Sequence, residues 1–162
     1  NVIGGGDFSV DRIIPDCVRA SENDGKVLLR SPNSTRPWQH VLEPLSGYMK
    51  LAQSLYHKEI QEIPSNWNFG PSIHKEITTG ELARLVLDIL GSGKVELDPL
   101  DHPHEAGLLQ LNCDKANIQL DWHPKWNGMD AIINTANWYK DVNSGKNPIE
   151  VTNNQILEYF DE

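Results

Sequence analysis

The sequence predicts an α/β fold, because short apolar runs alternate along it with longer segments of helical pattern. The short runs are bounded by turn residues, and the longer segments repeat their apolar residues every three or four positions. At 162 residues the chain is one domain by size and is long enough to bury a core. Its first apolar run, Val2-Ile3, is a poor start for an independent sheet, which favours a domain cut from a larger protein.

Turn residues mark the first elements. Val2-Ile3 is expected to be a strand that ends in glycines, and residues 13–20 a short helix. Residues 27–29 are apolar with turn residues on both sides, so we expect a second strand there.

A longer helix is expected from Pro44 to about Lys58. Proline suits the first turn of a helix, and Glu43 is a possible cap in front of it. Four apolar residues then recur at helical spacing: Leu45, Met49, Ala52 and Tyr56.

Capping boxes predict two further helix starts. In Thr78-Thr-Gly-Glu81 the hydroxyl and the carboxylate each satisfy a backbone donor, and an apolar stripe follows. Thr152-Asn-Asn-Gln155 has the same pattern and is expected to open a terminal helix through Phe160. The apolar residues of that helix, Ile156, Leu157 and Phe160, are expected to form a packing face.

The remaining elements follow from shorter patterns. We expect strands at residues 67–70, 95–97 and 108–111, and helices at residues 114–120 and 129–142.

Composition narrows the function. Asp and Glu number 23 against 14 Lys and Arg, a formal charge of -9, which argues against general nucleic-acid binding. Any anionic ligand must then be held by a few local arginines. The apolar runs are too short to span a bilayer and the N-terminus does not resemble a signal peptide, so a cytoplasmic location without membrane contact is expected. Cys17 and Cys113 are too few for a disulfide framework and are expected to be reduced and buried.

Gly4-Gly5-Gly6 invites comparison with a dinucleotide-binding loop. That loop needs glycines at G-x-G-x-x-G before a helix, but the third place here is Ser9. A turn is therefore expected in place of a cofactor loop.

Arg36 is the strongest local candidate for a binding residue. Its planar guanidinium matches phosphate oxygens, and Pro37 and Trp38 stiffen the backbone that presents it. An ordinary ion pair with a nearby carboxylate is an open alternative. Arg12 and Arg30 are weaker candidates for an anion.

Other motifs give weaker evidence for a functional site. His102-Pro-His-Glu105 lacks the further ligands that a closed zinc site requires, so no metal is expected. Neither cysteine stands near an obvious His base, which disfavours a cysteine nucleophile. Sugar stacking is a possible role for tryptophan, but we expect packing roles for the five in this chain: Trp38, Trp67, Trp122, Trp126 and Trp138.

Several motifs together resemble the CDP-glucose 4,6-dehydratase branch of the extended short-chain dehydrogenase/reductases. Arg36-Pro-Trp-Gln-His40 and His102-Pro-His-Glu-Ala106 are the more specific of them. Others match in order and approximate spacing over nearly the whole chain: Asn1-Val-Ile-Gly-Gly-Gly-Asp7, Asp11-Arg-Ile-Ile-Pro-Asp16, Trp67-Asn-Phe-Gly-Pro71, Leu120-Asp-Trp-His-Pro124 and Asn137-Trp-Tyr-Lys140.

This resemblance implies a fold and a reaction. The fold is the C-terminal part of an extended reductase, with part of a Rossmann sheet and a small substrate-binding subdomain. Residues 1–162 are then a single nucleotide-sugar-binding domain, a fragment without the N-terminal NAD-binding half. The family converts CDP-glucose to CDP-4-keto-6-deoxyglucose and water, with a bound NAD that is reduced and re-oxidised in each turnover.

The family's glycine loop and its Tyr-x-x-x-Lys pair are absent, because no Tyr here is followed four positions later by Lys. We therefore expect no catalytic residue, no cofactor and no activity in this chain alone.

The resemblance also implies substrate contacts at the diphosphate. Asn1 is expected to bond the diphosphate region and Arg36 the diphosphate itself. His102 or His104 is expected in the loop beside it.

The nucleotide contacts follow in the same way. Arg12 and Ile13 are expected to close over the nucleotide, and Leu29 to lie in the strand beside its base. After His-Glu-Ala the family usually places an aromatic residue, whereas Gly107-Leu108 stand here, so affinity or base choice is expected to differ.

The expected partner is a CDP-sugar or another nucleotide sugar, and self-association into a homo-oligomer is a further expectation. One rival hypothesis is a free-standing, catalytically inactive domain that binds nucleotides or assembles with itself. A second is a complete enzyme of another type, which the missing acid, base and nucleophile constellations disfavour.

Overall fold

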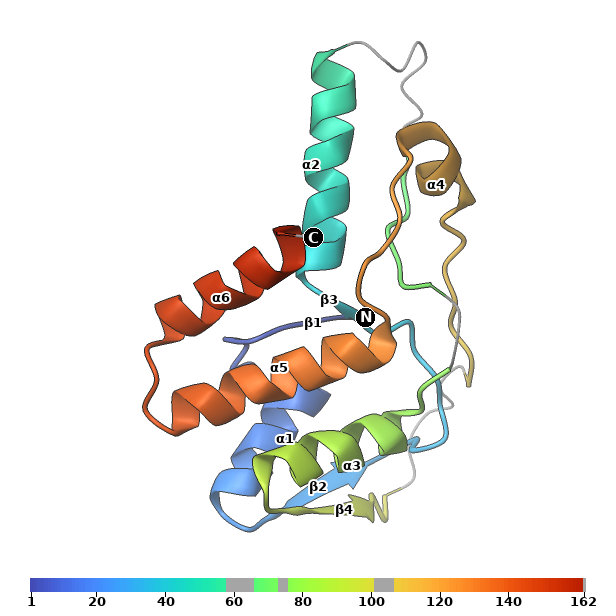
Figure 1. The fold of residues 1–162 in the computed structure, drawn as a ribbon. Coiled ribbons are helices and arrows are strands. Elements are labelled where there is room, and N and C mark those ends of the chain that lie inside the picture. The colour runs from blue at the N-terminus through green and yellow to red at the C-terminus, as the bar shows by residue number, and fades with distance from the viewer. Residues whose placement is uncertain (58–65, 73–75, 101–106, 162) are drawn as a thin grey trace.

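The computed structural model describes residues 1–57, 66–72, 76–100 and 107–161 (Figure 1). Helices and parallel strands are interspersed along them, which confirms the predicted α/β class. The elements in chain order are β1 (Val2–Ile3), α1 (Ile13–Glu22), β2 (Lys26–Leu29), β3 (Gln39–His40), α2 (Leu42–Tyr56), α3 (Thr79–Leu90), β4 (Lys94–Leu97), α4 (Asp114–Leu120), α5 (Gly128–Asn143) and α6 (Pro148–Phe160).

The strands form two small parallel sheets. In one, β1 pairs with β3 and Val2 lies opposite Gln39. In the other, β2 pairs with β4, from Lys26 opposite Lys94 to Leu29 opposite Leu97. Parallel neighbours need long crossover connections, and here each pair of strands is joined through at least one helix.

Helices cover these sheets and enclose the core. α5 lies across the middle of the molecule and packs against β3, α3 and α6, while α1 packs against α3 and β2 (Figure 1). The best-buried side chains between these elements include Cys17, Leu82, Val86, Ile132 and Tyr139. A second, smaller cluster lies between α2 and α4 and contains Phe69, Ala116, Leu120 and Trp122.

Most helix predictions are confirmed. The capping box at Thr78 forms, because its hydroxyl accepts from Glu81 N at 3.1 Å and the Glu81 carboxylate accepts from Thr78 N at 2.8 Å. The helices predicted at residues 13–20, 114–120 and 129–142 agree with α1, α4 and α5 to within two residues at each end. The predicted helix start near Pro44 corresponds to α2, which ends at Tyr56 before the described range stops.

Two predicted strands are wrong. Residues 67–70 and 108–111 have no strand structure. In the first segment, side chains replace the partner strand: Gln39 donates to the carbonyl of Phe69 at 2.9 Å, and Asn68 donates to that of Asn112 at 3.1 Å. The short strand β3 was missed, because Gln39-His40 is polar and carries no strand pattern.

Two predicted caps are also wrong. α2 begins at Leu42, so Glu43 lies inside its first turn and makes no cap. α6 begins at Pro148 with Asn147 as its cap, since the Asn147 side chain accepts from Ile149 N at 2.9 Å. Thr152 therefore lies within the helix, where its hydroxyl donates to the carbonyl of Pro148 at 2.8 Å.

The apolar stripes of α2 and α6 are only partly buried. On α2 the exposed fractions are 44% for Leu45, 54% for Met49 and 83% for Tyr56. On α6 the buried residues are Val151 and Tyr159, and the predicted packing residues Ile156, Leu157 and Phe160 are exposed. None of the helices within the described ranges is long and apolar enough to cross a bilayer.

Candidate functional site

The first of two clefts lies beside the N-terminal strand and is called here the Arg12 cleft. It has a volume of about 670 Å³, within the range of small-molecule sites. Its wall is made by β1, the loop that follows β1, the start of α1, and Trp38 and Val41, which flank the neighbouring strand β3. The polar and charged side chains on this wall are Asn1, Asp7, Asp11 and Arg12.

The second cleft, called here the Arg36 cleft, lies between α1, β2 and the segment that leads to β3. Its volume is about 780 Å³. Leu29 forms part of its wall beside Lys26 and Arg30, and Arg36, Thr79 and Asp98 are on the other sides. Leu29 is buried at the end of β2, and its carbonyl accepts from Asp98 N at 3.0 Å, which ties β2 to the segment after β4.

The two clefts adjoin. Asn1, Asp11, Ile13 and Trp38 line both of them. Five of the seven residues expected to bind substrate thus line two adjoining clefts: Asn1, Arg12, Ile13, Leu29 and Arg36. His102 and His104 lie outside the described residues.

Arg36 is held by its own segment, as the Pro37-Trp38 sequence predicts. Trp38 is buried, with its indole donating to the carbonyl of Ile77 at 3.1 Å. Its backbone N donates to the carbonyl of Arg36 at 2.9 Å, and Arg36 Nη1 donates to the carbonyl of Thr35 at 2.8 Å. The backbone N of Asn1 donates to the carbonyl of Pro37 at 2.7 Å, which joins β1 to this segment.

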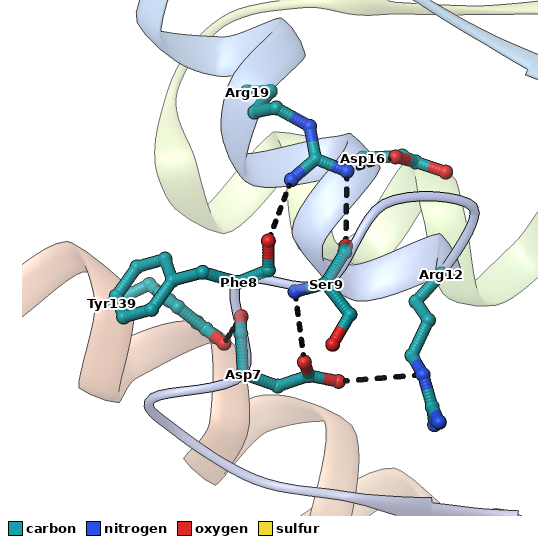
Figure 2. A network of polar contacts seen from close by, with 7 residues as sticks. All are labelled: Asp7, Phe8, Ser9, Arg12, Asp16, Arg19 and Tyr139. Atoms are coloured by element: carbon teal, nitrogen blue, oxygen red, sulfur yellow. Dashed lines mark hydrogen bonds and ion pairs between the residues drawn. The ribbon is translucent and has the colours of Figure 1, made fainter.

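Arg12 approaches the site from another element. It is the residue before α1 and has an extended backbone, so its side chain leaves the helix at the cleft. Its Nε lies 3.9 Å from an Asp7 carboxylate oxygen (Figure 2). Hydrogen bonds from Ser9 lower the pKa of Asp7, so this carboxylate is charged at neutral pH.

Charge in the clefts differs from that of the whole chain. Five cationic side chains line their walls against four carboxylates, although the chain carries -9 overall. The cations are Arg12, Arg19, Lys26, Arg30 and Arg36, and the acids are Asp7, Asp11, Asp16 and Asp98. The cleft walls thus carry a small excess of cations, whereas the whole chain is acidic.

The glycine run and the cysteines, which were also considered from the sequence, have structural roles in the fold. Gly6 has φ +85 and forms the predicted turn, and Trp138 fills the place where a Gly5 Cβ would lie. Cys17 is buried and burial raises its pKa to about 12, while Cys113 is half-buried. Within the described ranges no group of three His, Cys, Asp or Glu side chains is placed to hold a metal ion.

Tryptophan packing is also as predicted: Trp38, Trp122 and Trp138 are buried, and Trp67 and Trp126 are half-buried. A third cavity of about 40 Å³ beyond Arg36 and Trp38 is far smaller than either cleft.

Sequence reasoning missed Arg19 and Asp16, which line the Arg36 cleft. Their spacing of three residues within α1 allows the ion pair that they form, but it does not point to a ligand site. The contacts of Arg19 with Phe8 and Ser9 depend on the fold of the loop before α1.

Comparison with curated proteins bears on the family resemblance inferred from the motifs. Over 99% of its length the chain is 42% identical to CDP-glucose 4,6-dehydratase of Salmonella typhimurium, and the match covers 45% of that relative. The resemblance predicted from the motifs is therefore confirmed. The chain spans less than half the length of this relative. No protein-family model matches the chain.

Solved structures agree on the fold. Crystalline dTDP-glucose 4,6-dehydratase of Bacillus anthracis in complex with NAD matches 87% of the chain with a TM-score of 0.65 at 20% identity, over 42% of its own length. A UDP-galactose 4-epimerase matches 89% with a TM-score of 0.68 at 16% identity, over 43% of its length. The chain thus has a partial Rossmann-like α/β fold of the kind found in these proteins.

Proposed function

We propose that this chain is the substrate-binding portion of a nucleotide-sugar dehydratase resembling CDP-glucose 4,6-dehydratase, which converts CDP-glucose to CDP-4-keto-6-deoxyglucose and water. One observation carries the proposal. The residues expected to bind the nucleotide sugar, which are distant in sequence, line two adjoining clefts in a chain that is 42% identical to that enzyme.

In the proposed complex, the diphosphate lies in the Arg36 cleft beside Arg36 and Asn1, and Asn1 also lines the Arg12 cleft. Arg36 suits this role because its backbone is already held by Trp38, so little freedom is lost on binding. The base lies toward Leu29 in the Arg36 cleft, and Arg12 and Ile13 close over the nucleotide from the start of α1.

The test is a titration of the chain with CDP, followed by calorimetry or NMR chemical shifts. The Arg36→Ala variant is expected to bind at least about tenfold more weakly, because a charge-assisted hydrogen bond is lost. Arg36→Lys keeps the charge but loses the bidentate fork, so it is expected to lie between the two. Binding is expected to weaken with added salt.

Arg84→Ala is the matched control, since Arg84 is an exposed arginine on α3 outside both cleft walls. It removes the same charge and is expected to leave CDP affinity unchanged. Equal affinity in the wild type and Arg36→Ala would contradict the assignment of Arg36. The absence of any CDP binding by the wild type would contradict the proposed function.

The roles of His102 and His104, the choice of base and sugar, and a cytoplasmic location stay predictions. A second candidate function, a domain that assembles with copies of itself, is favoured by the exposed apolar face of α2. The two proposals are compatible, because the α2 residues of that face do not line either cleft.

A further inference from the structure

The loop between β1 and α1 is exposed, yet its backbone is held at several points. Phe8 and Val10 are exposed by 68% and 75%. The carbonyl of Asp7 nevertheless accepts from the Tyr139 hydroxyl at 2.5 Å. This loop supplies Asp7 and Asp11 to the wall of the Arg12 cleft and ends at Arg12 itself.

Arg19 provides the other attachment. From the last turn of α1 its guanidinium reaches back, with Nη1 donating to the carbonyl of Phe8 at 3.3 Å and Nη2 to that of Ser9 at 3.1 Å (Figure 2). The same guanidinium pairs with Asp16, one turn earlier on α1. A planar group with several donors can hold two successive carbonyls in a way that an ammonium cannot.

These contacts continue to Arg12. Ser9, whose carbonyl Arg19 holds, donates its backbone N to Asp7 Oδ1 at 3.0 Å. The other carboxylate oxygen of Asp7 faces Arg12 Nε, and the terminal nitrogens of Arg12 point away from Asp7 in Figure 2. Arg19 and Arg12 are thus connected through Ser9 and Asp7, with no contact between the two guanidinium groups.

We infer that Arg19 is a positioning residue: by holding the carbonyls of Phe8 and Ser9 it fixes Asp7, and through Asp7 it holds the Arg12 guanidinium in place to close over a bound nucleotide. This inference rests on the proposed function. The Arg12 side chain is 64% exposed and its pair with Asp7 is long, so on a loosened loop it would sample many directions. Fixing it before binding reduces the entropy that binding must overcome.

A double-mutant cycle tests the inference. Arg19→Ala is expected to weaken CDP binding about fivefold, and Arg12→Ala by at least as much. Because Arg19 acts through Arg12, the double variant is expected to bind no more weakly than Arg12→Ala alone. Arg19→Lys retains the charge but not the fork, so it is expected to behave like Arg19→Ala. Lys146→Ala, a cation paired with Asp141 outside both clefts, is the control and is expected to change nothing.

Additive losses in the cycle would overturn the inference, because they would mean that Arg19, which also lines the Arg36 cleft, contacts the ligand itself. Unchanged CDP affinity in Arg19→Ala would overturn it as well, and would leave an ordinary surface ion pair with Asp16.

A second measurement separates this inference from the proposed function. In the chain without ligand, the NMR signal of the Arg12 Nε–H is expected to shift and broaden in Arg19→Lys, and the amides of residues 8–11 to exchange faster with solvent. The melting temperature of each variant reports whether it is folded. If the wild type binds no CDP, the proposed function fails, and an unchanged Arg12 signal would then also reject the connection from Arg19 to Arg12.

Discussion

Glu43 shows how a single residue departs from its sequence pattern. Its side chain is buried in the first turn of α2. The two carboxylate oxygens are occupied by separate donors. Oε1 accepts from Trp126 N at 2.7 Å, and Oε2 accepts from Lys125 N at 3.2 Å and from the Tyr159 hydroxyl at 2.8 Å. The carboxylate therefore joins α2, the segment before α5, and α6.

Glu43→Gln is expected to destabilise the chain by about 1 to 3 kcal/mol, because the amide NH₂ is a donor and replaces one of two oxygens that each accept from a backbone N–H. Urea unfolding measures the change. Glu158→Gln, an exposed Glu on α6, is the matched control and is expected to stay within about 0.5 kcal/mol of the wild type.

The effect of pH on the destabilisation caused by Glu43→Gln follows from the pKa of Glu43. Burial raises the pKa of Glu43 above its ordinary value of 4.5, despite the opposing hydrogen bonds from Trp126, Tyr159 and Lys125. The folded state then binds the proton more tightly than the unfolded state. The stabilisation is complete below pH 4.5 and is lost as the pH rises through the raised pKa. The difference in unfolding free energy between wild type and Glu43→Gln should therefore become smaller as the pH rises through the raised pKa. A difference that becomes larger would contradict the raised pKa.

At the scale of elements, the N-terminal boundary of α6 can be tested by mutation of its cap. Asn147 caps the helix and Pro148 occupies its first turn, a combination typical of helix N-termini. Asn147→Ala is expected to cost about 1 kcal/mol in thermal or urea unfolding. Asn153→Ala is the control, because it makes the same change at an exposed position inside the same helix, where alanine is the better helix former. Equal effects of the two changes would argue against the cap.

Helices were predictable here because their signals are local. The hydroxyl and carboxylate of the Thr78-Glu81 box lie within one turn, so the sequence contains both partners. A strand instead needs a partner elsewhere in the chain. Residues 108–111 have a suitable apolar pattern but no neighbouring strand, while the polar Gln39-His40 becomes a strand because β1 lies beside it.

The residues of the candidate site likewise differ in whether their contacts are local in sequence. Arg36 was predictable, because Pro37 and Trp38 that hold it are its neighbours in sequence. Arg19 was not, because its contacts to Phe8 and Ser9 exist only once the loop folds back over α1. The roles of Arg12, Ile13 and Leu29 came from the family resemblance, and the structure adds their common location along two clefts.

At the scale of the whole molecule, several large apolar side chains are exposed to solvent and lie outside the core. α2 extends away from α1, α3 and α5 in Figure 1, and Leu45, Met49 and Tyr56 along it are exposed by 44%, 54% and 83%. β1 adds an exposed Val2 at the edge of a sheet of only two strands. Contiguous apolar surfaces and unpaired edges of this kind recruit partners.

We therefore predict that the chain associates with itself through the α2 face. Association is expected to strengthen with salt, because apolar burial drives it while a charge of -9 on each copy opposes it, and salt screens that repulsion. Met49→Glu places a charge in the centre of the face and is expected to shift the chain to monomers in light scattering or sedimentation. Ile149→Glu, an equally polar change at an exposed residue on α6, is expected to leave the association intact. A mass of 18.3 kDa for the wild type at all concentrations would contradict self-association, and equal effects of the two variants would remove its location from α2.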